Sequence, residues 1–210
     1  MINFHTHHPV KFGIQNIDNV EKCNFNPKQF YALGSHPWFK KINIELLENT
    51  ILNHSNIISI GECGLDKVKS YYPLKKQIDI LKQQIELSEY FKLPLTLHIV
   101  NAFNEIVALK KQIKPKQKWV IHGFNKYKLT ETLLDNGFYL SFGKALMSNQ
   151  KLQNSFKTVP NHKVLLETDD SDVKIENLYA FVADLKSFKL QDLTRLIREN
   201  IKTITNGKLA

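Results

Sequence analysis

The sequence predicts a single α/β domain over residues 1–210, folded as a distorted (β/α)8 barrel of the TIM type that lacks its first crossover helix. Three observations predict this class: strand-like apolar runs alternate with helical patterns, several runs are apolar throughout, and metal-ligating residue types follow the runs. Parallel strands are covered on both faces and therefore read as near-continuous apolar runs. The length agrees, because barrels of this class commonly have about 200 to 250 residues.

Eight apolar segments are predicted as strands, and they cover residues 2–5, 13–17, 30–34, 57–61, 95–98, 118–122, 138–142 and 164–168. Helical patterns, with apolar residues three and four positions apart, fall between most of the strands and after the last one. The predicted helices cover residues 44–52, 74–91, 101–111, 128–136, 146–156, 175–187 and 190–206.

The connection between the first two predicted strands is irregular. Only residues 8–12 separate them, whereas a parallel crossover needs a dozen or more residues. Either the first helix is missing and the barrel is distorted there, or the second strand is misplaced. We favour the missing helix.

A metal site is predicted at the ends of several strands. His5 and His7 end the first strand, and side chains at positions i and i+2 point to one face, so both imidazoles can converge on one ion. By itself such a pair also arises by chance. Metal-ligating residue types follow four later strands, however, and these are Glu62, His98, His122 and Asp169. Catalytic groups of a parallel barrel project from the same ends of its strands, so all six residues are expected at one site.

Composition narrows the class of protein. The net charge of +9 favours a polyanionic partner, but nearly all basic residues are lysines in a chain rich in asparagine and isoleucine, a usage that resembles an AT-rich genome. We therefore interpret the charge as permissive for nucleic-acid binding. No segment is typical of a signal peptide or of a membrane span, and two cysteines do not predict a disulfide framework. We expect a cytoplasmic protein without membrane association.

Six motifs resemble, in order and rough spacing, those of the TatD-like metal-dependent deoxyribonucleases, a branch of the amidohydrolase-type barrels. They are HTH (5–7), GSHPW (34–38), IGECGLD (60–66), LPLTLH (93–98), VIHGF (120–124) and LETD (166–169). The resemblance covers nearly the whole chain. It implies two divalent ions, one held by His5, His7 and Asp169 and the other by His98 and His122, with the Glu62 carboxylate bridging both.

The chemistry of such a site agrees with this ligand set. Two cations about 3.5 to 4 Å apart repel each other, so an anion such as Glu62 must lie between them. The ions would activate water for attack on phosphorus, and Asp169 would accept the proton. Mixed imidazole and carboxylate ligands suit zinc, manganese, magnesium or nickel.

Three further residues have two interpretations each. The resemblance implies that His36 contacts the scissile phosphate, whereas the alternative is a histidine that only caps its strand. Glu167 is either a functional carboxylate at the site or a buried acceptor that orients a histidine ligand. Asp66 either supports a ligand in the same way or caps a loop.

The residues that would bind substrate depart from the family pattern. Residues 99–101 (Ile-Val-Asn) replace a Ser-Arg-Asp-like stretch, so an arginine that could grip phosphate is absent. Lys126 offers only a point charge without the bidentate fork of arginine. After Asp169, residues 170–172 (Asp-Ser-Asp) stand where the family carries a proline and an Arg-Asn loop. All these changes affect substrate contacts and none removes a metal ligand.

The sequence therefore predicts a metal-dependent phosphodiesterase, a monomer that acts on single-stranded DNA or on DNA ends. A hydrolase of a small phosphoester or amide is an alternative, favoured by the shortened loops and the missing arginine. A non-catalytic metal-stabilised barrel that binds other proteins is another, although six buried-type polar groups are costly to keep together without an ion. A mononuclear deaminase would share the HTH motif and the late histidine and aspartate, but Glu62 at the bridging position argues against it.

Overall fold

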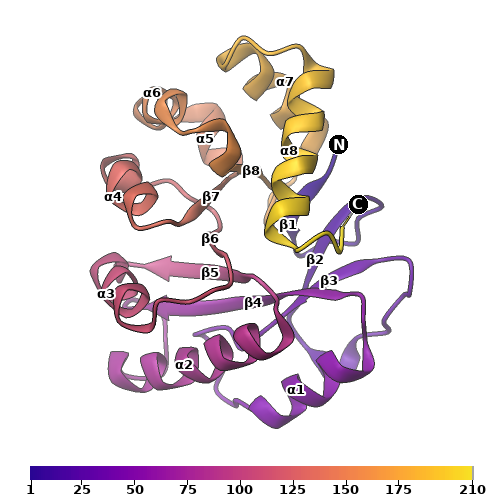
Figure 1. Cartoon of the computed structure of the whole chain (residues 1–210), viewed down its shortest axis with the longest axis vertical. Helices are drawn as coiled ribbons and strands as arrows, with labels where there is room; N and C mark the ends of the chain where they lie inside the picture. The colour runs from indigo at the N-terminus through magenta and orange to yellow at the C-terminus, as the bar shows by residue number, and fades with distance from the viewer. Residues whose placement is uncertain (210) are drawn as a thin grey trace.

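The computed structural model describes residues 1–209 and contains eight parallel strands in the order β1 to β8 (Figure 1). Each strand pairs with the next one along the chain, and a parallel bridge between Thr6 and Asp169 joins the two edges. The strands are β1 (Asn3–Thr6), β2 (Gly13–Ile17), β3 (Phe30–Leu33), β4 (Ile57–Asp66), β5 (Leu95–Val100), β6 (Trp119–Ile121), β7 (Tyr139–Phe142) and β8 (Val164–Leu166). The predicted distorted barrel is confirmed.

Helices follow the strands and surround the barrel, as Figure 1 shows. They are α1 (Ile44–Asn53), α2 (Leu74–Phe91), α3 (Phe103–Ile113), α4 (Thr130–Asp135), α5 (Lys144–Ser148), α6 (Gln150–Thr158), α7 (Ile175–Leu185) and α8 (Leu190–Ile204). Three short 3-10 helices complete the set: η1 (Val20–Lys22), η2 (Tyr127–Leu129) and η3 (Asn161–Lys163). Across residues 1–209, no helix has the length and apolar character needed to cross a membrane.

The missing first crossover helix is confirmed, because β1 passes to β2 through a short non-helical loop. The backbone N–H of Asn3 donates to the carbonyl of Phe12 over 3.0 Å, and Asn3 is in register with Gly13. A Cβ atom at Gly13 would lie only 2.4 Å from the Asn3 carbonyl oxygen. Glycine therefore allows the close approach with which β2 starts beside β1.

Two predicted boundaries were wrong. The helix expected over residues 146–156 is divided into α5 and α6 at Asn149, whose side chain accepts a hydrogen bond from Leu152 N over 3.1 Å. Asparagine inside a helical pattern acts here as an N-cap, which ends one helix and begins another. The strand expected to end at Gly61 continues as β4 to Asp66, so Glu62 lies within a strand and not beyond its end.

Gly64 makes the long β4 strand possible. It has φ 147°, and a Cβ atom there would lie 2.0 Å from the carbonyl oxygen of His98. Only glycine allows the two backbones to approach so closely. The pairing of β4 with β5 through Asp66 and Val100 therefore depends on this position, and it brings Glu62 and His98 to one site.

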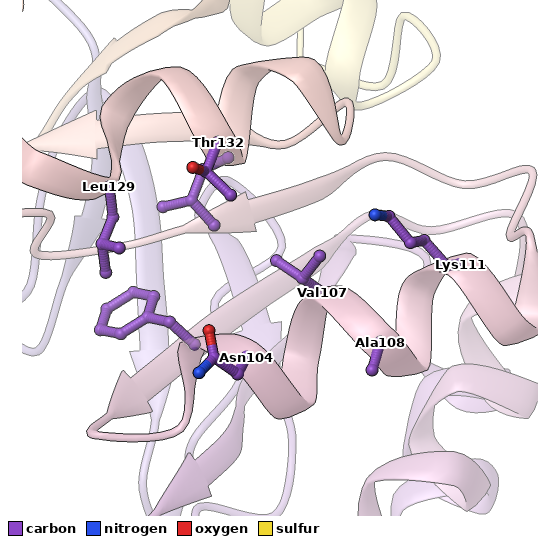
Figure 2. A pocket seen from close by; sticks show the side chains of 8 residues that line it. Asn104, Val107, Ala108, Lys111, Leu129 and Thr132 are labelled. Atoms are coloured by element: carbon purple, nitrogen blue, oxygen red, sulfur yellow. The ribbon is translucent and has the colours of Figure 1, made fainter.

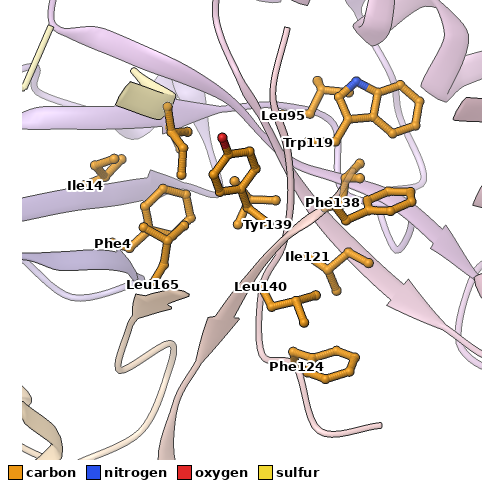
Figure 3. Packing of buried hydrophobic residues seen from close by; sticks show 14 of the residues in the cluster. Phe4, Ile14, Leu95, Trp119, Ile121, Phe124, Phe138, Tyr139, Leu140 and Leu165 are labelled. Carbon is orange, nitrogen blue, oxygen red and sulfur yellow. The ribbon is translucent and has the colours of Figure 1, made fainter. Parts of the chain in front are cut away.

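Apolar side chains fill the barrel and the layer between strands and helices. Figure 3 shows Phe4, Ile14 and Leu165 packed together, with Trp119 beside Phe138 at a ring-centroid distance of 6.1 Å. Trp119 and Phe138 are completely buried. This packing fixes the strands whose far ends carry the polar residues described below.

Lys110 on α3 lies against this apolar layer. Its Nζ atom is 4.6 Å from the Phe138 ring centroid and donates to the carbonyl oxygen of Asn136 over 2.9 Å. Burial, and then the nearby charges of Lys163 and Lys118, lower the pKa of Lys110 to about 8. An unfolded lysine has a pKa of about 10.4, so the unfolded chain binds more protons between these values. The free energy of unfolding therefore rises with pH across that window.

We expect Lys110→Met to be more stable than wild type near neutral pH, by about 1 kcal/mol after allowance for solvent screening and the lost hydrogen bond. The difference should disappear by about pH 10, where wild-type Lys110 is neutral in the folded state. Urea denaturation of both proteins at neutral pH and at about pH 10 measures this. A variant that is less stable than wild type at neutral pH would contradict the assigned cost of the buried charge.

Candidate metal centre

The buried carboxylate of Glu62 is the centre of a cluster of five histidines. Glu62 is 3% exposed, and its backbone N–H donates to the Asn16 side chain over 2.7 Å, which fixes this part of β4. The imidazole nitrogens surround both carboxylate oxygens. On Oε1 lie His5 Nε2 at 2.7 Å and His7 Nε2 at 2.8 Å, and on Oε2 lie His36 Nε2 at 3.2 Å, His122 Nε2 at 3.2 Å and His98 Nδ1 at 3.6 Å.

Asp169 lies on the Oε1 side of Glu62. Its Oδ1 atom is 3.5 Å from the Nε2 atoms of both His5 and His7. Backbone hydrogen bonds hold it there: Asp169 N donates to the carbonyl of His5, and His7 N donates to the carbonyl of Asp169. Asp169 has φ 53°, in the left-handed region that aspartate and asparagine tolerate better than most residues. The contact between β1 and the segment that follows β8 thus closes the barrel and completes this side of the cluster.

The structure brings all six expected ligands together and adds His36. Two groups have ligand atoms within 4.8 Å of one another, and these are His5, Glu62, His122 and Asp169, and His36, Glu62 and His98. Glu62 belongs to both groups, as expected for a bridging carboxylate. The division differs from the expected one, because His122 joins the first group, His36 joins the second, and His7 is in neither group although its Nε2 atom lies 2.8 Å from Glu62 Oε1. Which histidine serves which ion stays a proposal.

The charges in the cluster depend on one another. Burial raises the pKa of Glu62, but His122 and His5 outweigh it and hold this pKa far below the usual range. Burial also raises the pKa of Asp169, but the imidazoles of His5 and His7, each 3.5 Å away, outweigh it and hold this pKa well below its ordinary value. Both carboxylates are therefore ionised at neutral pH. Hydrogen bonds to Asp169, Asp18 and Glu62 raise the pKa of His7 to about 12.

The donor atoms fit divalent ions. The His5 imidazole is completely buried and neither of its nitrogens has a hydrogen-bond partner, although Nε2 lies 2.7 Å from Glu62 Oε1. Polar atoms buried without a partner are costly, and a cation between these atoms would give each of them one. Within residues 1–209 no lysine or arginine forms an ion pair with Glu62 or Asp169. Imidazole and carboxylate donors suit zinc, manganese, magnesium or nickel.

Carboxylates lie behind two of the imidazoles. Asp66 Oδ2 lies 3.2 Å from His98 Nε2, and Glu167 Oε1 lies 3.5 Å from His122 Nδ1. Glu167 is completely buried and also accepts from the backbone N–H of Gly123 over 2.6 Å. Such partners fix the tautomer and direction of a metal-binding histidine. The geometry therefore supports the interpretation of Glu167 and Asp66 as orienting acceptors.

Asp18 lies behind His7 in the same way, and its role was not predicted from the sequence. Its Oδ2 atom lies 3.0 Å from His7 Nδ1, and its Oδ1 atom accepts from Asn16 Nδ2 over 2.9 Å. Asp18 directly follows β2, so the rule that found the other residues, a polar group at a strand end, applied to it as well. The hydrogen bond to His7 lowers the pKa of Asp18, which keeps the carboxylate ionised.

A pocket of about 390 Å³ opens onto the cluster, and it is lined by His7, Asp18, His36, Trp38, Phe39, Glu62, His98, His122, Asp169 and Asp170. Lys126 lines a smaller pocket of about 190 Å³ beside His98 and His122. A third pocket, of about 270 Å³, lies between α3 and α4 (Figure 2). Its lining includes Val107, Lys111 and Leu129 but no residue of the cluster, so it takes no part in the site.

Comparisons with known proteins agree with the geometry. A family model described as TatD related DNase matches residues 9–206. A putative deoxyribonuclease TATDN1 homologue of Enterocytozoon bieneusi is 33% identical, over 88% of this chain and 72% of that protein. An uncharacterized metal-dependent hydrolase of Buchnera aphidicola is 27% identical, over 94% of this chain and 85% of that protein.

The fold is also that of solved relatives. The crystal structure of a TatD homologue from Escherichia coli superposes with a TM-score of 0.83, covers 98% of this chain and 97% of that one, and is 19% identical in sequence. The match of the family model extends over nearly the whole chain, and the cluster of histidines and carboxylates lies where that barrel fold places catalytic groups. The chain therefore belongs to the TatD family of metal-dependent hydrolases.

Proposed function

We propose that the protein is a phosphodiesterase that hydrolyses single-stranded DNA from an end and uses two divalent ions. The observation that carries this proposal is the position of the Glu62 carboxylate: Oε1 faces His5 and His7, and Oε2 faces His36, His98 and His122. The relative from Enterocytozoon bieneusi, described as a putative deoxyribonuclease, supports the choice of DNA. The net charge of +9 favours a polyanionic substrate.

The residues of the cluster have different roles in the proposed reaction. Two ions bound here would stabilise charge on the phosphoryl oxygens and make a water molecule more acidic. Asp169 borders the pocket and is ionised, so it can accept the proton of the attacking water. Asp18, Asp66 and Glu167 keep the imidazoles in place.

His36 is proposed to contact the scissile phosphate. It follows the end of β3 at Leu33 by three residues, lines the pocket, and its Nε2 atom lies 3.2 Å from Glu62 Oε2. We expect His36→Ala to keep two metal equivalents while its rate of phosphodiester cleavage falls about a hundredfold, as for removal of one transition-state donor. Elemental analysis and steady-state kinetics of the same preparation measure both quantities. Loss of one metal equivalent in parallel with activity would instead make His36 a ligand beside His98.

A hydrolase of small phosphoesters is the second candidate, favoured by residues 99–101 (Ile-Val-Asn), which provide no arginine next to the site. Metal-loaded protein incubated with single-stranded DNA, duplex DNA, RNA and methyl p-nitrophenyl phosphate separates the two candidates. We expect single-stranded DNA to be shortened from an end. Its binding should weaken as salt is added, and the logarithm of the binding constant should fall against the logarithm of the salt concentration with a slope of roughly −0.7 per contacted phosphate. Cleavage of the small ester alone, at low salt, would favour the second candidate. The cytoplasmic location and monomeric state stay predictions.

A further inference from the structure

Two loops beside the metal centre form an aromatic and basic surface, which we call the ledge. One loop connects β3 to α1 and the other connects β4 to α2. The ledge consists of Trp38, Phe39, Lys40, Lys41, Lys69 and Tyr71. All but Lys69 line one pocket of about 690 Å³, a volume typical of ligand sites.

Two of the three aromatic side chains of the ledge, those of Trp38 and Tyr71, are exposed, and Phe39 is half-buried. Trp38 is 39% exposed and Tyr71 is 64% exposed, although large aromatic side chains are normally buried to a greater extent. Lysines lie over both rings: Lys69 Nζ is 4.6 Å from the Trp38 ring centroid, and Lys40 Nζ is 4.4 Å from that of Tyr71. Exposed cation–π contacts are weak, so these lysines can leave the rings when a phosphate is near.

The ledge continues directly into the metal centre. Trp38 and Phe39 line both the ledge pocket and the pocket over Glu62. The Trp38 ring centroid is 4.6 Å from that of His36 and 5.3 Å from that of His98. A chain with one phosphodiester at Glu62 would therefore place its neighbouring nucleotide on the ledge.

Hydrogen bonds between the two loops, and one from Trp38 to the end of β4, hold the ledge in shape. Trp38 Nε1 donates to Asp66 Oδ2 over 2.6 Å, and the same Asp66 oxygen faces His98. Ser70 Oγ donates to the carbonyl of Pro37 over 2.7 Å, and the Tyr72 hydroxyl donates to the carbonyl of Lys40 over 2.8 Å. Side chains that are already ordered lose less entropy when a ligand binds.

The charges of the ledge suit an anionic ligand. Within residues 1–209, Lys40, Lys41 and Lys69 form no ion pair with a carboxylate, so their charges are available. Two acidic residues, Asp18 and Glu21, also line the ledge pocket, and Asp18 is held by His7. Aromatic rings interleaved with lysines are the combination by which proteins bind single strands, through base stacking and phosphate contacts.

We propose that the ledge binds a nucleobase and its flanking phosphate, one nucleotide away from the bond that is cleaved in a single strand. The proposal rests on the proposed phosphodiesterase function and extends it, because the ledge would provide the substrate contacts that the missing arginine does not. It requires that the base itself contributes to affinity, in addition to the phosphates.

Binding of two oligomers tests this requirement: an oligothymidylate, and an abasic deoxyribose-phosphate oligomer with the same number of phosphates. Fluorescence reports the contact, because the chain has only two tryptophans and Trp119 is completely buried. We expect oligothymidylate to quench Trp38 and to bind about 5- to 150-fold more tightly than the abasic oligomer. Tyr71→Ala should lose much of this preference and Tyr71→Phe should keep it. Tyr90→Ala, at a tyrosine 71% exposed on α2, is the matched control.

The possible failures are distinguishable. If wild type binds the two oligomers with equal affinity and its tryptophan fluorescence is not quenched, the proposal that the ledge binds a nucleobase is wrong, even if the protein cleaves DNA. Equal loss of affinity for both oligomers in Tyr71→Ala would overturn base stacking as well. Failure of the metal-loaded protein to cleave any phosphodiester, including methyl p-nitrophenyl phosphate, would instead contradict the proposed function, and the fluorescence titration would still decide whether the ledge binds bases.

Discussion

Glu62→Gln should lose turnover and metal affinity together, each by at least about a hundredfold. The substitution keeps the buried volume and removes only the negative charge that faces both groups of ligand atoms. Two cations that lack an anion between them repel each other strongly. Loss of a residue that only orients a metal ligand lowers metal affinity or activity by about 10- to 100-fold, so loss of the bridging charge itself should lower both by more.

Thermal unfolding in the presence of metal gives a readout that does not depend on activity. A metal at 100 times its dissociation constant stabilises the folded state by about 2.7 kcal/mol per site, so wild type should melt at a higher temperature when metal is added. Glu62→Gln should show much less of this increase. Glu131→Gln, at an exposed position on α4, is the control for the loss of a single charge. An active Glu62→Gln enzyme with full metal content would exclude the bridging role.

Asp169→Asn should lower the rate of cleavage by about 10²- to 10⁴-fold, the usual contribution of a general base. Asparagine tolerates the left-handed backbone at this position, φ 53°, and the backbone hydrogen bonds to His5 and His7 do not involve the side chain. The barrel should therefore close as in wild type. The amide can still offer an oxygen to a metal ion but cannot accept the proton of water.

Steady-state kinetics and elemental analysis of Asp169→Asn separate the two roles of this residue. A large fall in kcat with metal content reduced much less would support the proton-accepting role. Asp79→Asn, at an exposed position on α2, controls for the loss of a carboxylate. Retention of near-normal kcat would rule out Asp169 as the base, whatever the metal content.

Much of the metal centre follows from local patterns in the sequence. In a parallel barrel the strand ends meet on one face, so apolar runs that end in His5, His98 or His122 are sufficient to place these residues together. Asp18 obeys the same rule and was overlooked. The extension of β4 past Glu62 was not predicted, because it depends on the close contact of Gly64 with the backbone of His98.

The residues proposed to bind substrate could not be predicted from such local patterns. Trp38 and Tyr71 lie far apart in the sequence and belong to loops without periodic patterns. They are brought to one pocket by side-chain hydrogen bonds between those loops, such as that of Ser70 with the carbonyl of Pro37. No rule of spacing connects such residues. The sequence therefore shows which contacts of the family are missing, and only the structure suggests what replaces them.

The dinuclear centre bridged by Glu62 can be tested most directly by titrating the metal-free protein with Mn²⁺ while electron paramagnetic resonance is recorded. We predict that two equivalents bind and that their spectrum is that of a spin-coupled pair, because one carboxylate joins both ions. Glu62→Gln should not give the coupled spectrum. Saturation of wild type at one equivalent, or two equivalents with uncoupled spectra, would contradict a centre bridged by Glu62.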